Sequence, residues 1–345
     1  MLSRLKIRGK MFLILLTISI AVFILTFIFF KTIRDVEGYT SIEMSVDRLK
    51  SSMLMLRRHE KDFLLRKDLL YKEKFIQTYQ LSSYFGLNLD KKLKNYNYPD
   101  SEILSYLDKL ELYKDDFLKL TEVMQERGLD ENSGIYGSLR QTVHIVQKYA
   151  IDLNSTSLLA RLYELRKNEK DFMLRQNLIY SEKFIENFKK LEEMPLRQDI
   201  KSKLFEYKKE FLNLVEKDVI CGLNENLGLE GKMRNHAHKA EDLLKVLGTN
   251  ILDFEINQKN NMFKTMYLTA FVAVAIVLFL ILIISNNILN SLTIFQKGLL
   301  DFFDYLNKKK KSIFSIELDQ KDEFGEMAQL INEQIFQTTE FLKEE

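Results

Sequence analysis

The sequence predicts an all-α membrane protein, and three observations lead to this prediction. Two runs without a charged residue, at residues 11–30 and 266–285, are each long enough to cross a bilayer as a helix. Helix breakers are scarce, since the 345 residues include only 12 Gly and 2 Pro. One module of about twenty residues occurs twice between the apolar runs. We therefore expect two stacked four-helix bundles, built from two long and four short helices, between two transmembrane helices, with a parallel helical module after them.

The chain begins with a basic segment followed by the first apolar run. Residues 1–10 carry the cations Arg4, Lys6, Arg8 and Lys10. Residues 11–30 would span ~30 Å as a helix, about the thickness of the bilayer core. A signal peptide has a shorter apolar core and a small-residue cleavage site, whereas this run ends in Phe-Ile-Phe-Phe-Lys. We predict an uncleaved transmembrane helix at 11–30 with residues 1–10 in the cytoplasm.

The second apolar run, residues 266–285, returns the chain to the side on which it started. Residues 31–265 then form an outward-facing domain, and residues 286–345 lie in the cytoplasm. Lys297 and the run Lys308–Lys311 agree with this orientation, because cytoplasmic segments are enriched in lysine and arginine. We expect Lys308–Lys311 to form a solvated connector that faces lipid headgroups.

The repeated module organises the outward-facing domain. Residues 56–76 return as residues 165–185 with 14 of 21 positions identical. Two further segments recur at a shorter offset, 113–120 as 207–214 and 128–144 as 222–238. The drop in offset indicates that the second copy lacks about one short helix, which the membrane-side half of the first long helix can supply. We therefore expect a distal bundle at about 55–155 and a proximal bundle formed by about 31–54 with 156–265.

Glycine and proline positions set the expected helix ends. Gly128 suits a C-terminal cap, Asn132 or Ser133 suits the following N-cap, and Pro99 and Pro195 each stand where a helix begins. Between these positions the apolar spacing of three and four residues is typical of amphipathic helices. The expected helices cover residues 31–86, 87–94, 99–127, 134–194, 196–219 and 228 into the second span.

Two heptad segments follow the second span. The first runs from Ile288 to Leu306, the second from Phe324 to Leu342, and a polar connector separates them. Asp322, Glu323 and Gly325 open the second segment. Parallel heptad helices pack best with a second chain, so we expect a homodimer.

The ectodomain resembles the helical bimodular sensor domain of bacterial chemoreceptors, the methyl-accepting chemotaxis proteins. The repeated EKDFLLR and EKDFMLR and the two glycine turns, each followed by an arginine, carry this resemblance across nearly all of residues 31–265. Residues 286–345 are similar to a HAMP domain, whose Asp-Glu-x-Gly motif matches Asp322, Glu323 and Gly325. The usual proline near the start of its first helix is absent, because Asn290, Ser291 and Leu292 stand there.

The resemblance implies a two-pass receptor of the bacterial inner membrane that senses small organic acids in the periplasm. It also implies homodimers, receptor arrays and downstream chemotaxis proteins, where a signalling domain is present. No such domain follows before Glu345. Two other interpretations remain open: the input half of a sensor histidine kinase or cyclase, and a ligand-free structural helical membrane protein.

The polar residues that the repeat doubles are the candidate ligand contacts. Arginine offers the planar donor pair that a buried carboxylate ligand needs. An alternative is that the repeated carboxylates Glu60 and Glu169 are structural and are neutralised by Arg140 and Arg234. The candidates are Arg57 with Arg166, Arg66 with Arg175, Arg140 with Arg234, and His144 with His238.

The sharpest hypothesis concerns Arg234 and His238. These residues share one helix face at i and i+4, and their helix continues into the second span. We expect them to bind a small carboxylate in the proximal bundle around the second copy. The alternative is that Arg234 pairs with Glu169.

The chain contains none of the common catalytic or nucleotide-binding motifs. There is no GxSxG, HExxH, Walker or dinucleotide-binding pattern, so we expect no enzyme activity, no catalytic residue and no cofactor. His236 and His238 lack a nearby third ligand, so no metal site is expected, and Cys221 suits a partly buried position near a turn. A net charge of +2 favours no nucleic-acid partner. The expected partners are a second copy, the lipid bilayer and a small carboxylate.

Overall fold

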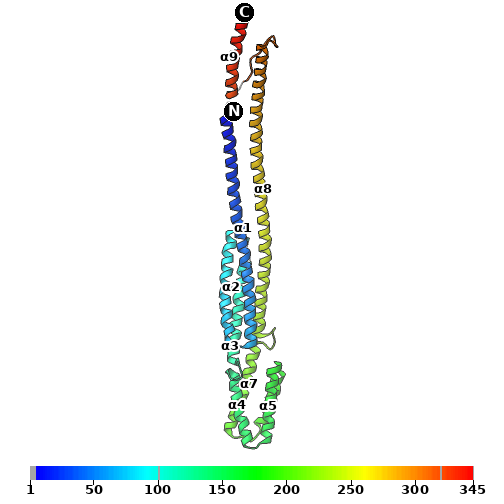
Figure 1. Cartoon of the computed structure of the whole chain (residues 1–345). Helices are drawn as coiled ribbons and strands as arrows, with labels where there is room; N and C mark the ends of the chain where they lie inside the picture. The colour runs from blue at the N-terminus through cyan, green and yellow to red at the C-terminus, as the bar shows by residue number, and fades with distance from the viewer. Residues whose placement is uncertain (1–4, 100–101, 319–320, 345) are drawn as a thin grey trace. The chain divides into compact units, whose positions relative to one another are not determined.

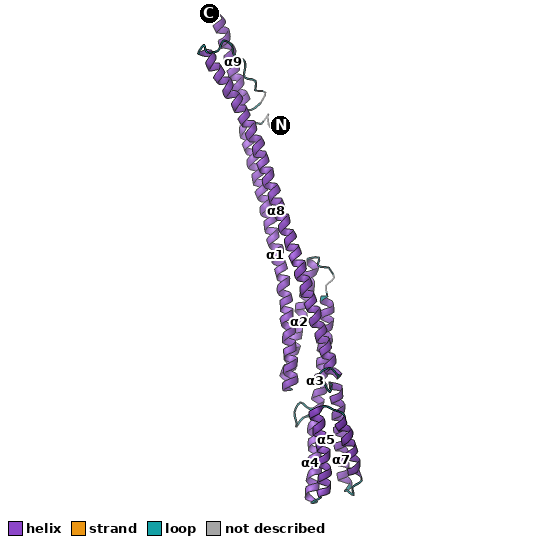
Figure 2. Cartoon of the chain, turned by 90° about the vertical axis from the view of Figure 1, so that its right-hand side faces the viewer, coloured by secondary structure: helices purple, strands orange, loops and turns teal. Residues whose placement is uncertain are grey.

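The computed structural model describes residues 5–99, 102–318 and 321–344, with side chains as far as residue 340. Arg4 therefore lies outside the described residues, as does the side chain of Leu342. Within these ranges all the regular elements are helices (Figure 2), and there are nine of them. The first eight cover the part of the chain for which six helices were expected, and the ninth is the expected second heptad helix. They are α1 (Ile7–Arg66), α2 (Leu69–Asn95), α3 (Ile103–Arg127), α4 (Gly134–Asp152), α5 (Thr156–Arg175), α6 (Ile179–Glu192), α7 (Gln198–Cys221), α8 (Gly228–Leu306) and α9 (Glu323–Glu344).

The two expected long helices are each interrupted inside the repeated module. Lys67 and its repeat partner Gln176 adopt left-handed backbone angles, with φ of 54° and 48°. The next residue in each copy is Asp68 or Asn177, whose side chain accepts a hydrogen bond from the backbone two residues on. The expected helices 31–86 and 134–194 were therefore wrong, because the module is a helix–turn–helix and not a continuous helix.

A third interruption divides α4 from α5. Asn154 has φ of 50°, and Ser155 caps α5 by accepting a hydrogen bond from Leu158 N. The separate helix expected at 87–94 is the end of α2. The predicted cap at Gly128 is confirmed, since its N–H donates to Met124 O at 3.0 Å.

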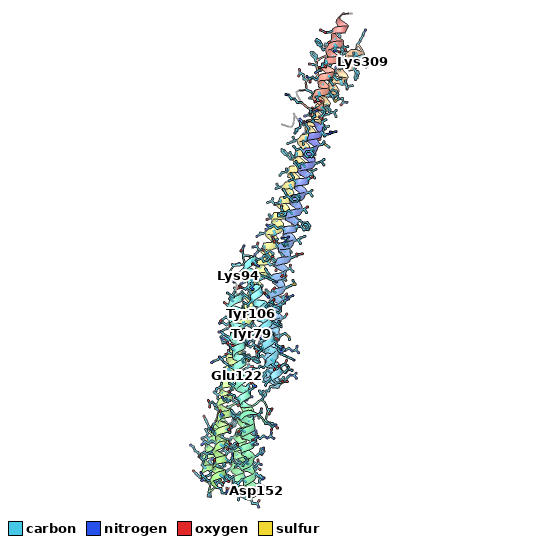
Figure 3. All side chains as sticks on the ribbon, turned by 90° about the vertical axis from the view of Figure 1, so that its left-hand side faces the viewer. Tyr79, Lys94, Tyr106, Glu122, Asp152 and Lys309 are labelled. Carbon is cyan, nitrogen blue, oxygen red and sulfur yellow. The ribbon has the colours of Figure 1, made fainter. Side chains whose placement is uncertain are left out.

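The chain divides into two compact units, 39–255 and 1–38 with 256–345. Within unit 39–255, α4, α5, α6 and α7 share one hydrophobic core, and we call them the second helical group. The first helical group consists of α2, α3 and the parts of α1 and α8 inside this unit. Figure 1 shows α2 and α3 beside α1, and Figure 3 labels Tyr106 there, whose hydroxyl lies 3.2 Å from Ser82 Oγ.

The same aromatic cluster fills the core of each group. Phe75 stacks on Phe117 in the first group with ring centres 4.0 Å apart, and their repeat partners Phe184 and Phe211 lie 4.1 Å apart in the second. Phe63 and Phe172 meet these stacks edge-on. The repeated sequence therefore encodes a repeated core as well as repeated polar residues.

The two copies exchange their fourth helices. Copy one comprises α1 to α4, yet α4 packs on α5 and α7 of copy two. In return α8 closes copy one, through ion pairs such as Arg57 Nε with Glu241 Oε1 at 3.4 Å. The expected division into 55–155 and 31–54 with 156–265 does not match this packing, because helices from both copies occupy each group.

Equivalent glycine turns make the two crossings possible. Gly128 and Gly222 have φ of 112° and 123°, and Gly134 and Gly228 have φ of 55° and 58°. A Cβ on Gly222 would overlap the carbonyl oxygen of Leu227, so the turn excludes side chains there. The chain crosses from one group to the other at each of these turns.

The other unit contains the apolar parts of α1 and α8. In the described residues these two helices are long and apolar enough to cross a membrane, and 0% and 6% of their most apolar windows are buried. A core helix of a soluble protein would be mostly buried, so these surfaces suit lipid contact. A cavity of about 200 Å³ lies between them, lined by residues such as Ala21 and Ala273.

The end of α8 packs against α9 and the connector. Phe295, Ile316 and Ala328 form a small core, and Asn332 Oδ1 accepts a hydrogen bond from Ile316 N at 2.6 Å. Lys309, labelled in Figure 3, follows the end of α8. The 21 residues from Ser285 to Leu306 place this end ~30 Å along the helix from the apolar run. Lys308–Lys311 are exposed, as expected of a solvated connector, and their contact with headgroups stays a prediction.

Candidate functional site

A buried tyrosine–glutamate pair occurs once in each helical group. Tyr207 Oη donates to Glu169 Oε2 at 2.6 Å in the second group, and Tyr113 Oη donates to Glu60 Oε2 in the first. Both tyrosines and both carboxylates are buried. The pair lies on helix positions that the repeat preserves, α1 with α3 and α5 with α7.

Burial raises the pKa of both tyrosines well above the usual value, and the adjacent glutamate raises it further. Tyr113 and Tyr207 therefore stay protonated and act as hydrogen-bond donors near neutral pH. Each glutamate accepts a hydrogen bond from its tyrosine hydroxyl and also lies beside a basic side chain. Arg57 Nη1 pairs with Glu60, and in the second group Lys170 Nζ lies 3.0 Å from Glu169 Oε1.

In the second helical group a pocket of about 280 Å³ opens above the buried pair. Arg166 Nη1 lies 3.8 Å from Glu169 Oε1 at its base, and Arg140 comes from α4 on the other side. The structure therefore brings together three sequence-predicted residues, Arg140, His144 and Arg166. The full lining is Glu131, Tyr136, Leu139, Arg140, His144, Arg166, Glu169, Lys170 and Met173.

Arg140 is held at the rim of this pocket by weak partners. Its Nη1 lies 2.6 Å from Glu131 Oε1 and donates to Asn132 Oδ1 at 3.3 Å. The Glu131 side chain is 72% exposed, and exposed ion pairs contribute at most ~1 kcal/mol. An anion that enters the pocket can therefore replace Glu131 at Arg140 with little loss. Burial raises the pKa of Tyr136, so its hydroxyl also remains a donor.

The equivalent positions in the first group include more carboxylate side chains. Glu230 stands where the second group has Tyr136, and Glu241 stands where it has Gln147. Glu241 contacts Arg57 Nε at 3.4 Å and His238 Nδ1 at 3.1 Å. Burial raises the pKa of Glu230, and the nearby Glu60 adds to this effect. Both arginines of this site have carboxylate partners within the protein, Glu60 and Glu241 for Arg57 and Glu225 for Arg234.

The charge balance separates the two groups. The second-group pocket has three cationic side chains, Arg140, Arg166 and Lys170, against two carboxylates, Glu131 and Glu169. The equivalent first-group positions have three cations, Arg57, Lys61 and Arg234, against three carboxylates, Glu60, Glu225 and Glu230. The second-group pocket therefore has one more cation than carboxylate, an excess that the equivalent first-group positions lack, and such an excess favours an anionic ligand.

The structure places Arg234 and His238 in the first group, against copy one instead of copy two. Arg234 Nη1 pairs with Glu225, as its repeat partner Arg140 pairs with Glu131. The alternative pairing of Arg234 with Glu169 was wrong, since Glu169 meets Arg166, Lys170 and Tyr207. The buried glutamates do pair with cations, but with cations on their own helices, and each also accepts a hydrogen bond from a tyrosine.

Arg66 and Arg175 do not join either cluster. Each pairs with the aspartate four residues before it, Asp62 or Asp171, at 3.4 Å. Each guanidinium also lies over a tyrosine ring, Tyr71 or Tyr180. These repeated arginines therefore support the turn of the module.

The remaining candidates have separate surroundings. His236 Nδ1 lies 2.7 Å from Asp116 Oδ2, while His238 turns to Glu241, so the two histidines do not share a carboxylate. Among the described residues no group of three or more metal-ligating side chains gathers. Cys221 is buried at the end of α7, and burial raises its pKa to about 11. Asp322, Glu323 and Gly325 lie at the start of α9.

Sequence reasoning overlooked the two tyrosines, Lys170 and Glu131. Tyr113 and Tyr207 recur at the same offset as the segments that contain them, YKDDFLKL and YKKEFLNL, and this recurrence was the available signal. Lys170 likewise repeats Lys61 inside the identical EKDF motif. Glu131 carried no comparable signal of proximity to Arg140, because their contact depends on the fold of the glycine turn.

Comparison of this chain with protein-family models, with curated proteins and with solved structures finds no match.

Proposed function

We propose that this protein is a homodimeric transmembrane signalling receptor, and not an enzyme, that binds a small carboxylate in the second helical group. The observation that carries the proposal is the pocket lined by Arg140, Arg166 and Lys170 above the buried Tyr207–Glu169 pair. A volume of about 280 Å³ suits a small organic acid, and two guanidinium groups offer bidentate recognition of its carboxylate.

The proposal places the signal path along α7 and α8. α7 leads through the Gly222 turn into α8, which runs as one helix from Gly228 to Leu306 through the second apolar run. Binding that draws α4 towards α5 would strain the contacts of both with α7, and the turn would pass this strain to α8. Small helix displacements of ~1–2 Å are typical of such switches.

The proposed location is the bacterial inner membrane with residues 31–265 in the periplasm. The basic residues Lys6, Arg8 and Lys10 before the first apolar run and Lys308–Lys311 after the second support this orientation. The two helical groups act in this proposal as two four-helix bundles. Residues 286–345 act as a HAMP-like output module, and chemotaxis proteins are its downstream partners where a signalling domain is present.

Two alternative functions differ from the proposed one in different observations. The input half of a sensor histidine kinase or cyclase would use the same pocket, so only the output distinguishes it. A ligand-free structural protein would not require an excess of cations around the pocket of one helical group that the equivalent positions of the other group lack. The imbalance between Tyr136 and Glu230 at equivalent positions favours a ligand-binding function.

A thermal-shift screen tests the proposal. We expect the full chain in nanodiscs to gain stability with at least one of acetate, succinate, citrate and benzoate, by ~2.7 kcal/mol at one hundred times Kd. Sodium chloride at matched ionic strength is the control for salt effects. If no member of a broad carboxylate panel stabilises the protein above this control, the receptor proposal fails.

A further inference from the structure

A buried ion pair joins three helices in the unit that contains the apolar runs. Lys10 of α1 and Asp322, which precedes α9, are both 0% exposed, and Lys10 Nζ lies 2.7 Å from Asp322 Oδ2. The same ammonium group donates to Asn287 Oδ1 of α8 at 2.6 Å. Lys10 directly precedes the first apolar run and Asn287 closely follows the second. One side chain therefore touches the ends of both proposed spans and the start of the last helix.

Because the Lys10–Asp322 pair is buried, its stability depends on the relative positions of the helices that carry it. Removing an ammonium and a carboxylate from water costs several kcal/mol per ion, which close pairing and further hydrogen bonds must offset. A helix shift of ~1–2 Å, the size typical of receptor switches, would break a hydrogen bond of this length. The network therefore holds only while α1, α8 and α9 keep one relative arrangement.

The same residues also form the helix ends. Asp322 Oδ1 accepts a hydrogen bond from Gly325 N at 3.3 Å and so caps the first turn of α9. Glu323 Oε2 accepts from Ile7 N at 2.6 Å, which satisfies a donor that the first turn of α1 leaves open. Asp322 thus caps α9 itself, Glu323 caps α1, and the Lys10–Asp322 ion pair joins the two helix starts.

We propose that Lys10, Asn287 and Asp322 form a latch that holds the first turn of α9 against α1 and α8. A displacement of α8 relative to α1 moves Asn287 away from Lys10, weakens the Lys10–Asp322 pair and frees the start of α9. The latch makes α1 a direct participant in output, because the connector between Leu306 and Asp322 is not the only link from α8 to α9. This inference goes beyond the proposed ligand site and does not depend on it.

Hydrogen exchange of the full chain in nanodiscs tests the latch. Lys10→Met is expected to speed amide exchange in residues 322–330 at least tenfold, because Asp322 loses its counter-ion and its hold on the first turn. Lys6→Met is the matched control, because Lys6 directly precedes the same helix. Lys6 pairs with Glu326 at 3.2 Å, but both side chains are about 60% exposed, so we expect a change below twofold.

Two further variants separate the latch from the cap. Asp322→Asn should also speed exchange at 322–330, and the double variant with Lys10→Met should exchange no faster than the faster single variant, because both act through one contact. Asn287→Ala, which removes no charge, should raise the same exchange at least threefold. The latch is overturned if Lys10→Met and Asn287→Ala both stay within twofold of the wild type, or if Lys6→Met matches Lys10→Met.

Discussion

Replacing Arg127 with alanine is expected to lower the free energy of unfolding by about 3 to 5 kcal/mol. Arg127 Nη1 donates to Asp218 Oδ1 at 2.7 Å, and the Asp218 side chain is 1% exposed. Burial lowers the pKa of Arg127, but the charge of Asp218 outweighs this effect and the net pKa is raised, so the arginine remains charged. The substitution would leave a buried carboxylate without its counter-ion where α3 meets α7.

The measurement is a urea titration of the full chain in nanodiscs followed by helical circular dichroism. Lys217→Ala is the matched control, because Lys217 joins the same two helices through Glu126, whose side chain is 59% exposed. Its loss should be at most ~1 kcal/mol. Equal losses in the two variants would show that burial of Asp218 does not govern this junction.

Replacing Phe184 with alanine is expected to cost about 3 to 5 kcal/mol, and Phe75→Ala should cost the same within ~1 kcal/mol. Both rings are fully buried, and their centres lie 4.1 Å and 4.0 Å from those of Phe211 and Phe117, respectively. The equality follows from the repeated core, since each variant opens the same cavity in its own group.

The same urea titration measures both losses, with Phe205→Ala as the control. Phe205 lies on α7 in the second group, but its side chain is 52% exposed, so its removal should cost below ~1.5 kcal/mol. A cost for Phe75→Ala that is several-fold smaller than that for Phe184→Ala would contradict the equivalence of the two cores.

The sequence predicted the helical class and the repeat because both rest on local patterns. It also contained the signal for the missed turns. Asp68 and Asn177 occupy the same position in the two copies, and such residues cap helices better than they continue them. The absence of glycine and proline outweighed this signal in the prediction, although Lys67 and Gln176 adopt left-handed angles without glycine.

The exchange of fourth helices could not be predicted from the repeat. Each fourth helix has the same apolar spacing, so α4 and α8 suit either copy by pattern alone. Long-range pairs decide the outcome, such as Asp116 with His236 at 2.7 Å and Arg57 with Glu241. These pairs join residues far apart in the chain, and no local pattern indicates them.

The candidate site was predicted only in part, because the repeat is a local pattern whereas the pairing of its helices is not. Arg140, His144 and Arg166 were identified from the repeat, and they line one pocket. The prediction joined Arg234 and His238 to copy two, and this error follows directly from the exchange. The aligned repeat already contained the charge difference at Tyr136 and Glu230, but only the fold shows that Tyr136 lines the pocket.

Isothermal titration of the most stabilising carboxylate into Arg140→Ala and Arg234→Ala, both as full chains in nanodiscs, tests the central claim most directly. The two arginines are repeat partners with similar exposed ion pairs, so each is the control for the other. Loss of a charge-assisted hydrogen bond worth about 1.5 to 3 kcal/mol should weaken binding to Arg140→Ala at least tenfold. Arg234→Ala should bind within twofold of the wild type. Normal affinity in Arg140→Ala together with lost affinity in Arg234→Ala would contradict the account and place the site in the first helical group.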